Sequence, residues 1–433
     1  MVTTKDKTIL RELAKAVREL AALEVNKERV RRIRDMHSLK PVRPPVWIDE
    51  IPWHEMDIEG QLVLRCEAPE ARDIETHFRR ILYRWKYIQA DMVVEDAFYV
   101  TKAFTVTPEG AESDSIDGEK AWYSLMAGTG ITIKEETLAT NDANHIVSHH
   151  YEDQLDTEEK LAALTMPVVH ARTEIDKKNL EMTADIFGDI LPVKLRGYGI
   201  YYAPWDEIAM LRGIENCLID MADRPEFVHK TVAKFTDIGL ARYTQMEAQG
   251  LLDYNISQLH CTPPYSDDLP ASDYDGEHVR LKDIWFRGMA QLFSSASPAM
   301  QDEFDLQYMR KLMDKCGLSY YGCCEPLHNF IPYLKKVPNM RKIGVSPWAD
   351  VRSSAEQIGG DYVFARKPNP AHVARNFNPE VVEKEITETI EACLENKCPY
   401  EFVLKDISTV AFNPQNLIEW EKTVTKVIDR YYR

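Results

Sequence analysis

Thiol, imidazole and carboxylate groups occur together in two short segments of the sequence. One segment reads Cys323-Cys324-Glu325-Pro326-Leu327-His328, and the other places His260 beside Cys261. Zinc in proteins prefers thiolate, imidazole and carboxylate ligands, and a catalytic zinc uses three of them and keeps one position open. The candidate metal ligands are therefore Cys324, Cys323, His260, Cys261 and His328. In the alternative interpretation, one cysteine packs as a small apolar side chain and His328 faces solvent.

Other residues could transfer protons or bind an anion. Carboxyl and imidazole groups can exchange a proton with a bound substrate. Asp350 is one catalytic candidate, although its place just before a predicted helix equally favours a helix cap. Arg366 and Lys367 could bind a substrate anion.

Strand-like and helix-length segments alternate through the C-terminal third of the chain. The predicted strands cover 318–322, 340–345, 361–365 and 400–404, and the predicted helices cover 327–336, 350–358, 379–396 and 414–430. Repeated strand–helix units with short connections predict a parallel sheet. With similar units upstream, the chain length favours an α/β fold that closes into a (β/α)8 TIM barrel. Active sites of this fold form at the carboxyl ends of the strands, so the candidate residues are expected at one mouth.

The sequence predicts two parts. Residues 1–160 are expected to form an N-terminal helical arm and an α+β extension that packs on the barrel, and residues 161–433 are expected to form the barrel itself. Within the first part, leucine and valine recur at three- and four-residue spacing over 5–37, which predicts a helix. This arm could dock on the protein's own surface or join two copies in a homodimer.

Composition limits the function classes. The formal net charge of −17 repels phosphate backbones, so nucleic-acid binding is not expected. The sequence contains no run of about 18 apolar residues, so no transmembrane helix is expected. The polar N-terminus lacks a signal peptide, which predicts a cytoplasmic protein whose eight cysteines stay reduced.

The motifs at the predicted strand ends resemble a known family. Tyr321–Leu327, Val345–Asp350, Arg366–Pro370 and Leu404–Asp406, together with the helix pair Glu215–Val228, resemble the uroporphyrinogen decarboxylase superfamily. The resemblance covers roughly residues 40–430 and implies a (β/α)8 barrel. The superfamily includes the decarboxylases of haem synthesis and methyltransferases that use corrinoid proteins.

Two motifs distinguish the branches of this family. The decarboxylases carry arginines after an Arg-x-Pro-Val-Trp motif to hold the substrate's propionates, whereas here Arg43–Trp47 is followed by Asp49, Glu50 and Glu55. Carboxylates at these positions would repel a tetrapyrrole with eight carboxylates. The coenzyme M methyltransferases carry His-x-Cys at a strand end, where this chain has Gly322-Cys323-Cys324.

The resemblance is therefore strongest to the first methyltransferase of an O-demethylase system. It implies transfer of a methyl group from a methoxylated aromatic, or a similar small methyl donor, to the cob(I)alamin of a separate corrinoid protein. It also implies a homodimer. The leaving group would be assisted by a zinc ion at Cys324 and its neighbours or, without zinc, by a proton donor such as His260, Glu325 or His54. The chain lacks an Asp-x-His-x-x-Gly cobalamin motif, so the cobalamin is expected on the partner.

A flat aromatic donor would suit aromatic side chains at the mouth. The candidate substrate-binding residues are Trp53, Glu50, Trp205, Tyr265, Trp348, Arg366 and Lys367. One alternative is a metal-dependent decarboxylase or lyase that holds a small carboxylic acid with Arg366 and Lys367. A second alternative is a catalytically silent corrinoid-binding or scaffold protein.

Overall fold

A parallel sheet of six strands forms the centre of the computed structural model, which describes residues 2–111, 115–138, 148–375 and 377–432. The order along the sheet is β1 (Val46–Ile48), β13 (Tyr400–Leu404), β12 (Val363–Arg366), β11 (Met340–Val345), β10 (Leu318–Tyr321) and β9 (Trp285–Gly288). All neighbouring strands in it are parallel. Residues of β10, β12 and β13 are buried throughout, as in a sheet that is covered on both faces.

Two further strands continue the parallel arrangement. β2 (Phe98–Thr101) pairs with β8 (Val193–Arg196), and the chain after β8 makes single parallel bridges, Tyr198–Leu252 and Tyr202–Gly288. The second bridge connects this segment to β9. Within the described segments no ladder joins β1 to β2, so closure into a ring of eight strands stays a prediction. The predicted strand at 251–256 is reduced to the bridge at Leu252.

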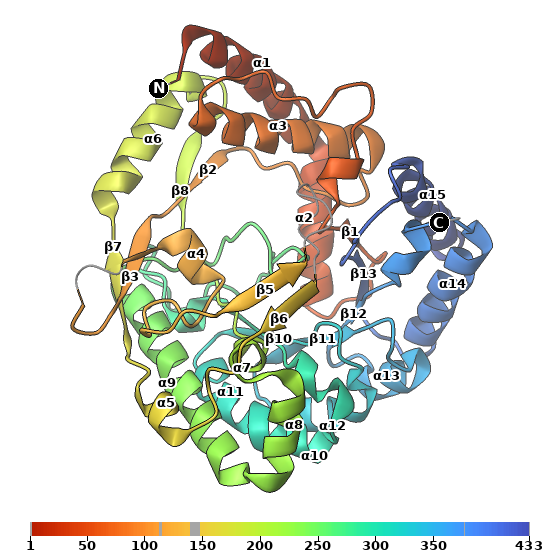
Figure 1. Cartoon of the computed structure of the whole chain (residues 1–433). Coiled ribbons are helices and arrows are strands. Elements are labelled where there is room, and N and C mark those ends of the chain that lie inside the picture. The colour runs from red at the N-terminus through yellow and green to blue at the C-terminus, as the bar shows by residue number, and fades with distance from the viewer. Residues whose placement is uncertain (1, 112–114, 139–147, 376, 433) are drawn as a thin grey trace.

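Helices lie outside the strands and form most of the rim in Figure 1. They are α7 (Pro204–Arg212), α8 (Ile214–Asp223), α9 (Pro225–Ala248), α10 (Pro298–Gln301), α11 (Gln307–Met313), α12 (Ile331–Leu334), α13 (Val351–Ile358), α14 (Pro379–Glu395) and α15 (Gln415–Tyr431). Proline in the first turn starts α7, α9, α10 and α14, because its fixed φ suits that position. The strand–helix alternation predicted for the C-terminal third is confirmed.

The N-terminal arm is two helices rather than one. α1 (Thr4–Ala21) and α2 (Glu24–His37) are separated at residues 22–23. α1 buries Leu10 and Val17 in a cluster with Phe78 of α3 (Pro69–Tyr87) and Phe187 of α6 (Thr173–Phe187). The apolar stripe of the arm is therefore covered by the chain itself, and the homodimer stays a prediction.

Strands from the two predicted parts pair with each other in more than one sheet. β1, which precedes residue 160, pairs with β13 through Val46–Phe402, and β2 pairs with β8. The division at residue 160 stays a prediction. The segment between β2 and α6 adds the antiparallel strands β3 (Phe104–Pro108), β4 (Ile116–Asp117) and β7 (Pro167–Ala171), the hairpin β5 (Glu135–Leu138) and β6 (Ser148–Tyr151), and helices α4 (Gly118–Trp122) and α5 (Glu158–Ala162). The hairpin crosses the centre of the helix ring in Figure 1.

In the part of the chain that the structure describes, no helix combines the length and apolar character needed to span a membrane.

Candidate active site

A cavity of about 550 Å³ opens at the carboxyl ends of β1 and β9. Its wall includes the aromatic residues Trp53, Trp122 and Tyr201 together with the polar residues Asp49, Glu50, Asp206, His260, Cys261 and Arg287. A largely apolar wall with a few converging polar groups is typical of small-molecule sites, and the volume suits a ligand of that size.

Two adjacent thiols lie next to this cavity, at the end of β10. The backbone conformation before these thiols requires glycine at position 322. Gly322 has a φ of 111°, which other residues rarely adopt, and a Cβ there would lie 2.4 Å from the Leu327 side chain. Cys323 Sγ lies 3.6 Å from Cys324 Sγ and 3.4 Å from His260 Nε2. The strand end therefore places Cys323 between a second thiol and an imidazole.

Of the two thiols, Cys323 is the one whose ionisation the surroundings favour. The Cys324 thiol donates towards it, and the positive charges of Lys367 and Lys405 add to this effect, so the pKa of Cys323 lies well below its ordinary value despite burial. Hydrogen bonding to the Cys323 thiolate raises the pKa of Cys324, whose Sγ also donates to Asp406 Oδ2 at 3.2 Å.

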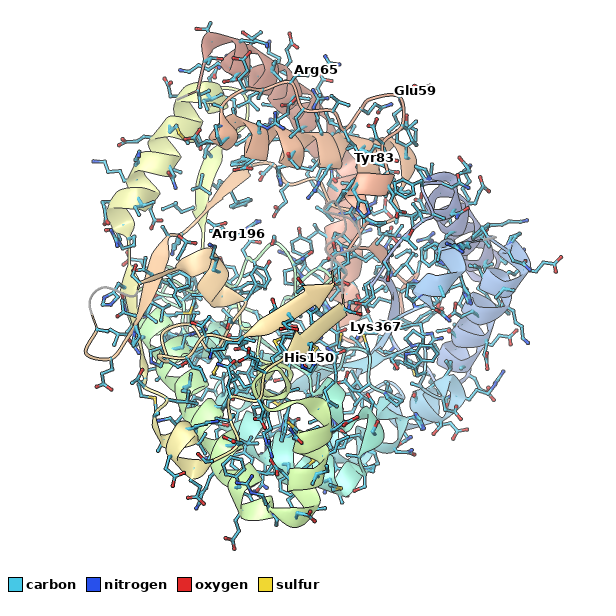
Figure 2. All side chains as sticks on the ribbon, viewed as in Figure 1. Glu59, Arg65, Tyr83, His150, Arg196 and Lys367 are labelled. Carbon is cyan, nitrogen blue, oxygen red and sulfur yellow. The ribbon has the colours of Figure 1, made fainter. Side chains whose placement is uncertain are left out.

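Buried cations surround this thiolate. Lys405 Nζ lies 3.5 Å from Cys323 Sγ and 3.4 Å from Glu50 Oε2. Lys367 Nζ, on the inner side of the helix ring in Figure 2, donates to the carbonyl oxygens of Gly322 at 3.0 Å and Cys323 at 2.8 Å. Burial would lower the pKa of Lys405, but the negative charges near it raise that pKa overall. Lys405 is thus a permanent positive charge beside the thiolate.

Substituting Lys405→Met is expected to raise the pKa of Cys323, because it removes a cation whose Nζ lies 3.5 Å from the Cys323 Sγ. The ultraviolet absorbance of the thiolate, followed against pH, measures this, with Cys323→Ser as the blank. Lys426→Met, at an exposed position of α15, is the matched control and should leave the titration unchanged. An identical thiolate titration in Lys405→Met and the unsubstituted protein would contradict this electrostatic account.

Asp206 is the cavity carboxyl best suited to carry a proton. It lies in the first turn of α7, where Gln291 Nε2 donates to its Oδ2 at 3.4 Å. Burial, then the charges of Glu325 and Cys323, raise the pKa of Asp206 to about 7. The side chain is therefore shared between its acid and carboxylate forms near neutral pH, as a general acid requires.

The neighbouring Glu207 fixes the helix that carries Asp206. Its buried carboxylate accepts hydrogen bonds from the Met126 amide and the Ser124 hydroxyl, both at 2.9 Å. These bonds attach α7 to the segment that forms another wall of the cavity. Sequence reasoning missed Asp206; the available signal was Pro204, which starts a helix directly after a strand-like segment.

His260 reaches the cavity from a tight turn. His260 and Cys261 have φ values of 43° and 64°, in the left-handed region that costs energy for residues other than glycine. Burial, and then the charge of Arg287, lower the pKa of His260 to about 3, so its imidazole is neutral. It can hydrogen-bond to a ligand or to Cys323, but it holds no proton to give as an acid at neutral pH.

The predicted catalytic residues occupy different places. Glu325 is 1% exposed and accepts hydrogen bonds from the amides of Cys323 at 2.8 Å and Ala290 at 3.3 Å, so it supports the thiol loop from behind. His54 does not line the cavity, and its Nε2 lies 3.6 Å from Oε1 of Glu55. Asp350 caps α13 by accepting the Ser353 amide at 2.9 Å, as the capping interpretation expected.

Some of the predicted substrate-binding residues line a cavity and others do not. Glu50 and Trp53 line the cavity, and Tyr265 lines a neighbouring one. Trp205 is 1% exposed and packs in the core, where its indole donates to Phe304 O at 3.1 Å, whereas Trp348 is 69% exposed. Arg366 donates to Ser346 O at 2.6 Å and Glu385 at 2.9 Å. With Lys367 bonded to backbone carbonyls, neither predicted anion-binding side chain faces the cavity.

The five predicted metal ligands do not converge. His260, Cys323 and Cys324 form a line of contacts, Cys261 Sγ donates to Glu50 Oε1 at 3.4 Å, and His328 Nδ1 faces the Asp350 amide at 3.4 Å. Across the described ranges, no three histidine, cysteine or acidic side chains are placed to hold one metal ion. The side chains as arranged do not fit zinc, which needs at least three ligands around one point.

Comparisons with known proteins leave the family open. No family model matches the sequence, and no curated protein sequence matches it. Among solved structures, a methyltransferase from Methanosarcina mazei aligns with 93% of this chain and 98% of its own, with 12% identity and a TM-score of 0.47. A likeness this distant carries no argument about activity.

Proposed function

We propose that this protein is a methyltransferase that moves a methyl group from a methoxylated aromatic, or a similar small methyl donor, to the cob(I)alamin of a separate corrinoid protein. One observation carries the proposal: Asp206, with a pKa of about 7, lies in an aromatic-walled cavity beside the Cys323–His260 contact. An ether oxygen is a poor leaving group, and a buried acid that is protonated near neutral pH removes this obstacle.

The reaction balances as a displacement at carbon. The bond between the methyl carbon and the ether oxygen breaks, its electron pair stays on oxygen, and the proton of Asp206 converts that oxygen into a neutral phenol. The acceptor supplies the electron pair for the new bond to the methyl carbon and is formally oxidised by two electrons. Asp206 then regains a proton from water before the next turnover.

The remaining cavity residues position the donor. Trp53, Trp122 and Tyr201 offer flat surfaces for an aromatic ring. The carboxylates of Asp49 and Glu50 disfavour a donor with several negative charges, which agrees with exclusion of a tetrapyrrole. The corrinoid would stay on its own protein, because a cavity of about 550 Å³ suits the donor alone.

Zinc stays a prediction of the family resemblance. The side chains at Cys323, Cys324 and His260 would have to rotate to enclose a metal, so no step above passes through one. Metal analysis of the purified protein tests it: stoichiometric zinc that is lost in Cys324→Ala would establish a site there. The decarboxylase or lyase alternative loses support because Arg366 and Lys367 are already engaged by protein atoms.

Product analysis separates these reactions. The protein would be incubated with a panel of methoxylated aromatics, with and without a reduced corrinoid protein, and the products identified by mass spectrometry. The proposal predicts one phenol per donor consumed, and only when the corrinoid protein is present. Loss of carbon dioxide from a carboxylic acid without any corrinoid protein would instead establish the lyase.

A further inference from the structure

A second cavity of about 530 Å³ lies beside the first, between α3 and the strands β1 and β2. The two cavities share Asp49, Ile51, Trp53 and Gln258 in their walls. α3 runs along the upper part of the ring in Figure 1, above β2 and β8. The second cavity therefore adjoins the proposed reaction site without containing the thiols or Asp206.

The helix that walls this cavity turns polar side chains towards it. Asp73, Thr76, His77, Arg80 and Arg84 of α3 all line it, at the three- and four-residue spacing of one helix face. A helix that packs on a protein normally turns apolar residues inwards. Asp73, His77 and Arg80 are exposed, so water solvates them and a ligand that enters from solvent can reach them by displacing that water.

Arg80 is exposed and is bound by no acidic or carbonyl group of the described chain. Its guanidinium stacks on Trp53, 4.9 Å from the ring centroid, and it makes no hydrogen bond or ion pair with any residue the structure describes. Arg84 stacks on Trp47 at 5.4 Å and donates through Nη2 to Ile48 O at 2.9 Å, while its buried Nε has no partner. Two guanidinium groups thus present free donors to one cavity.

The acids around this cavity leave the charge of Arg80 uncompensated. Glu95 is bound by Arg196 at the end of β8, with 3.0 Å between Nη1 and Oε2 (Figure 2). Burial lowers the pKa of Arg84, and the negative charge of Asp49 opposes that shift. Asp73 lies two turns from Arg80, about 10 Å along the helix. Only Arg80 among these cations has neither a carboxylate nor a carbonyl bound to it.

The wall also contains several aromatic side chains, next to aliphatic residues such as Ile51, Met92 and Leu191. Trp47, Trp53, Phe78, Phe98 and Tyr265 line the cavity. His77 is accessible to water, yet the surrounding protein lowers its pKa to about 4, so it adds a neutral ring to the wall. Flat apolar surfaces next to a free guanidinium suit a flat ligand with one negative charge.

The geometry points to a binding site for an aromatic carboxylate in the second cavity, with the carboxylate on Arg80 and the ring against the aromatic wall. Arginine binds carboxylates through two parallel hydrogen bonds, and stacking on Trp53 holds the guanidinium plane in place. The site goes beyond the proposed methyl transfer and does not depend on it.

Calorimetric titration tests this site with benzoate as the probe and benzamide as its neutral isostere. We expect benzoate to bind at least about tenfold more tightly than benzamide, and Arg80→Gln to remove that difference, because the charge-assisted hydrogen bonds are lost. Arg31→Gln, at an exposed position of α2, is the matched control and should bind benzoate like the unsubstituted protein.

Further variants make the outcome decisive. Arg80→Lys keeps the charge but loses the paired hydrogen bonds, so its affinity for benzoate should fall between those of Arg80→Gln and the unsubstituted protein. Asp206→Asn should bind benzoate with the affinity of the unsubstituted protein, because Asp206 does not line the second cavity. This result would show that benzoate binding is independent of the reaction cavity, whether or not the protein transfers methyl groups. Equal binding of benzoate and benzamide, or unchanged benzoate affinity in a folded Arg80→Gln, would overturn the assignment.

Discussion

Replacing Asp206 by asparagine is expected to slow methyl transfer by about 10²–10⁴-fold, the usual contribution of a general acid, and to leave donor binding nearly unchanged. The amide keeps the size and hydrogen bonding of the carboxyl but has no proton to give to the leaving oxygen. Single-turnover rates at saturating donor measure the chemical step directly. Asp223→Asn, at the exposed end of α8, is the matched control and should retain full activity.

The pH dependence of methyl transfer should also follow from Asp206. Asp206 must be protonated to act as an acid, and its pKa is about 7. The rate should therefore be highest below pH 7 and fall as the pH rises through that value, and Asp206→Asn should lose this fall. A rate that is independent of pH across this range in the unsubstituted protein would remove Asp206 from the acid role.

The leaving group provides an independent check on this assignment. A nitrophenol leaves as a stable anion and needs little help from an acid, so Asp206→Asn should slow its methyl ether far less than an unactivated ether. Equal losses with both donors would mean that Asp206 supports the structure of the site instead of protonating the leaving oxygen.

Replacing Lys342 by methionine should destabilise the protein by about 3–5 kcal/mol, the typical cost of leaving a buried charge without its partner. Lys342 of β11 and Glu401 of β13 are 0% and 1% exposed, and Nζ lies 2.8 Å from Oε1. The hydroxyl of Thr262 donates to the second carboxylate oxygen at 2.7 Å. Urea unfolding followed by circular dichroism measures the change in the free energy of unfolding.

The double variant Lys342→Met/Glu401→Leu isolates the cause of this loss. It removes both charges, so it should recover much of the stability that Lys342→Met loses. The recovery is expected to be partial, because Thr262 loses its acceptor. If the free energy of unfolding of Lys342→Met lies within about 1 kcal/mol of that of the unsubstituted protein, the two charges do not depend on each other as a buried pair would.

Local patterns predicted the C-terminal strand–helix units well. β10 to β13 and α13 to α15 occur where apolar runs alternate with helix-length segments, since periodicity and the glycine and proline breaks are local features. The break between α1 and α2 was not predicted, because apolar spacing continues across Leu23. Closure of the barrel depends on contacts between distant strands, which one sequence does not contain.

The candidate site was predicted in part, and the errors have a common physical origin. The family resemblance pointed to Glu50 and Trp53, which line the cavity, and strand-end reasoning brought His260 and Cys323 together. It did not determine which way a side chain faces after the strand ends, so it gave similar roles to buried Trp205 and exposed Trp348. Asp206 was missed because its pKa depends on burial and on Glu325, which only the folded chain brings near.

The most direct test of the proposed function is the visible spectrum of a corrinoid protein during a single turnover. The protein would be mixed with a reduced, cob(I)alamin-loaded corrinoid protein and a panel of methoxylated aromatics and methylated amines. The proposal predicts conversion of cob(I)alamin to methylcobalamin with at least one methoxylated donor, at a rate that Asp206→Asn lowers. No conversion with any donor, while a control methyltransferase methylates the same corrinoid protein, would contradict the proposed function.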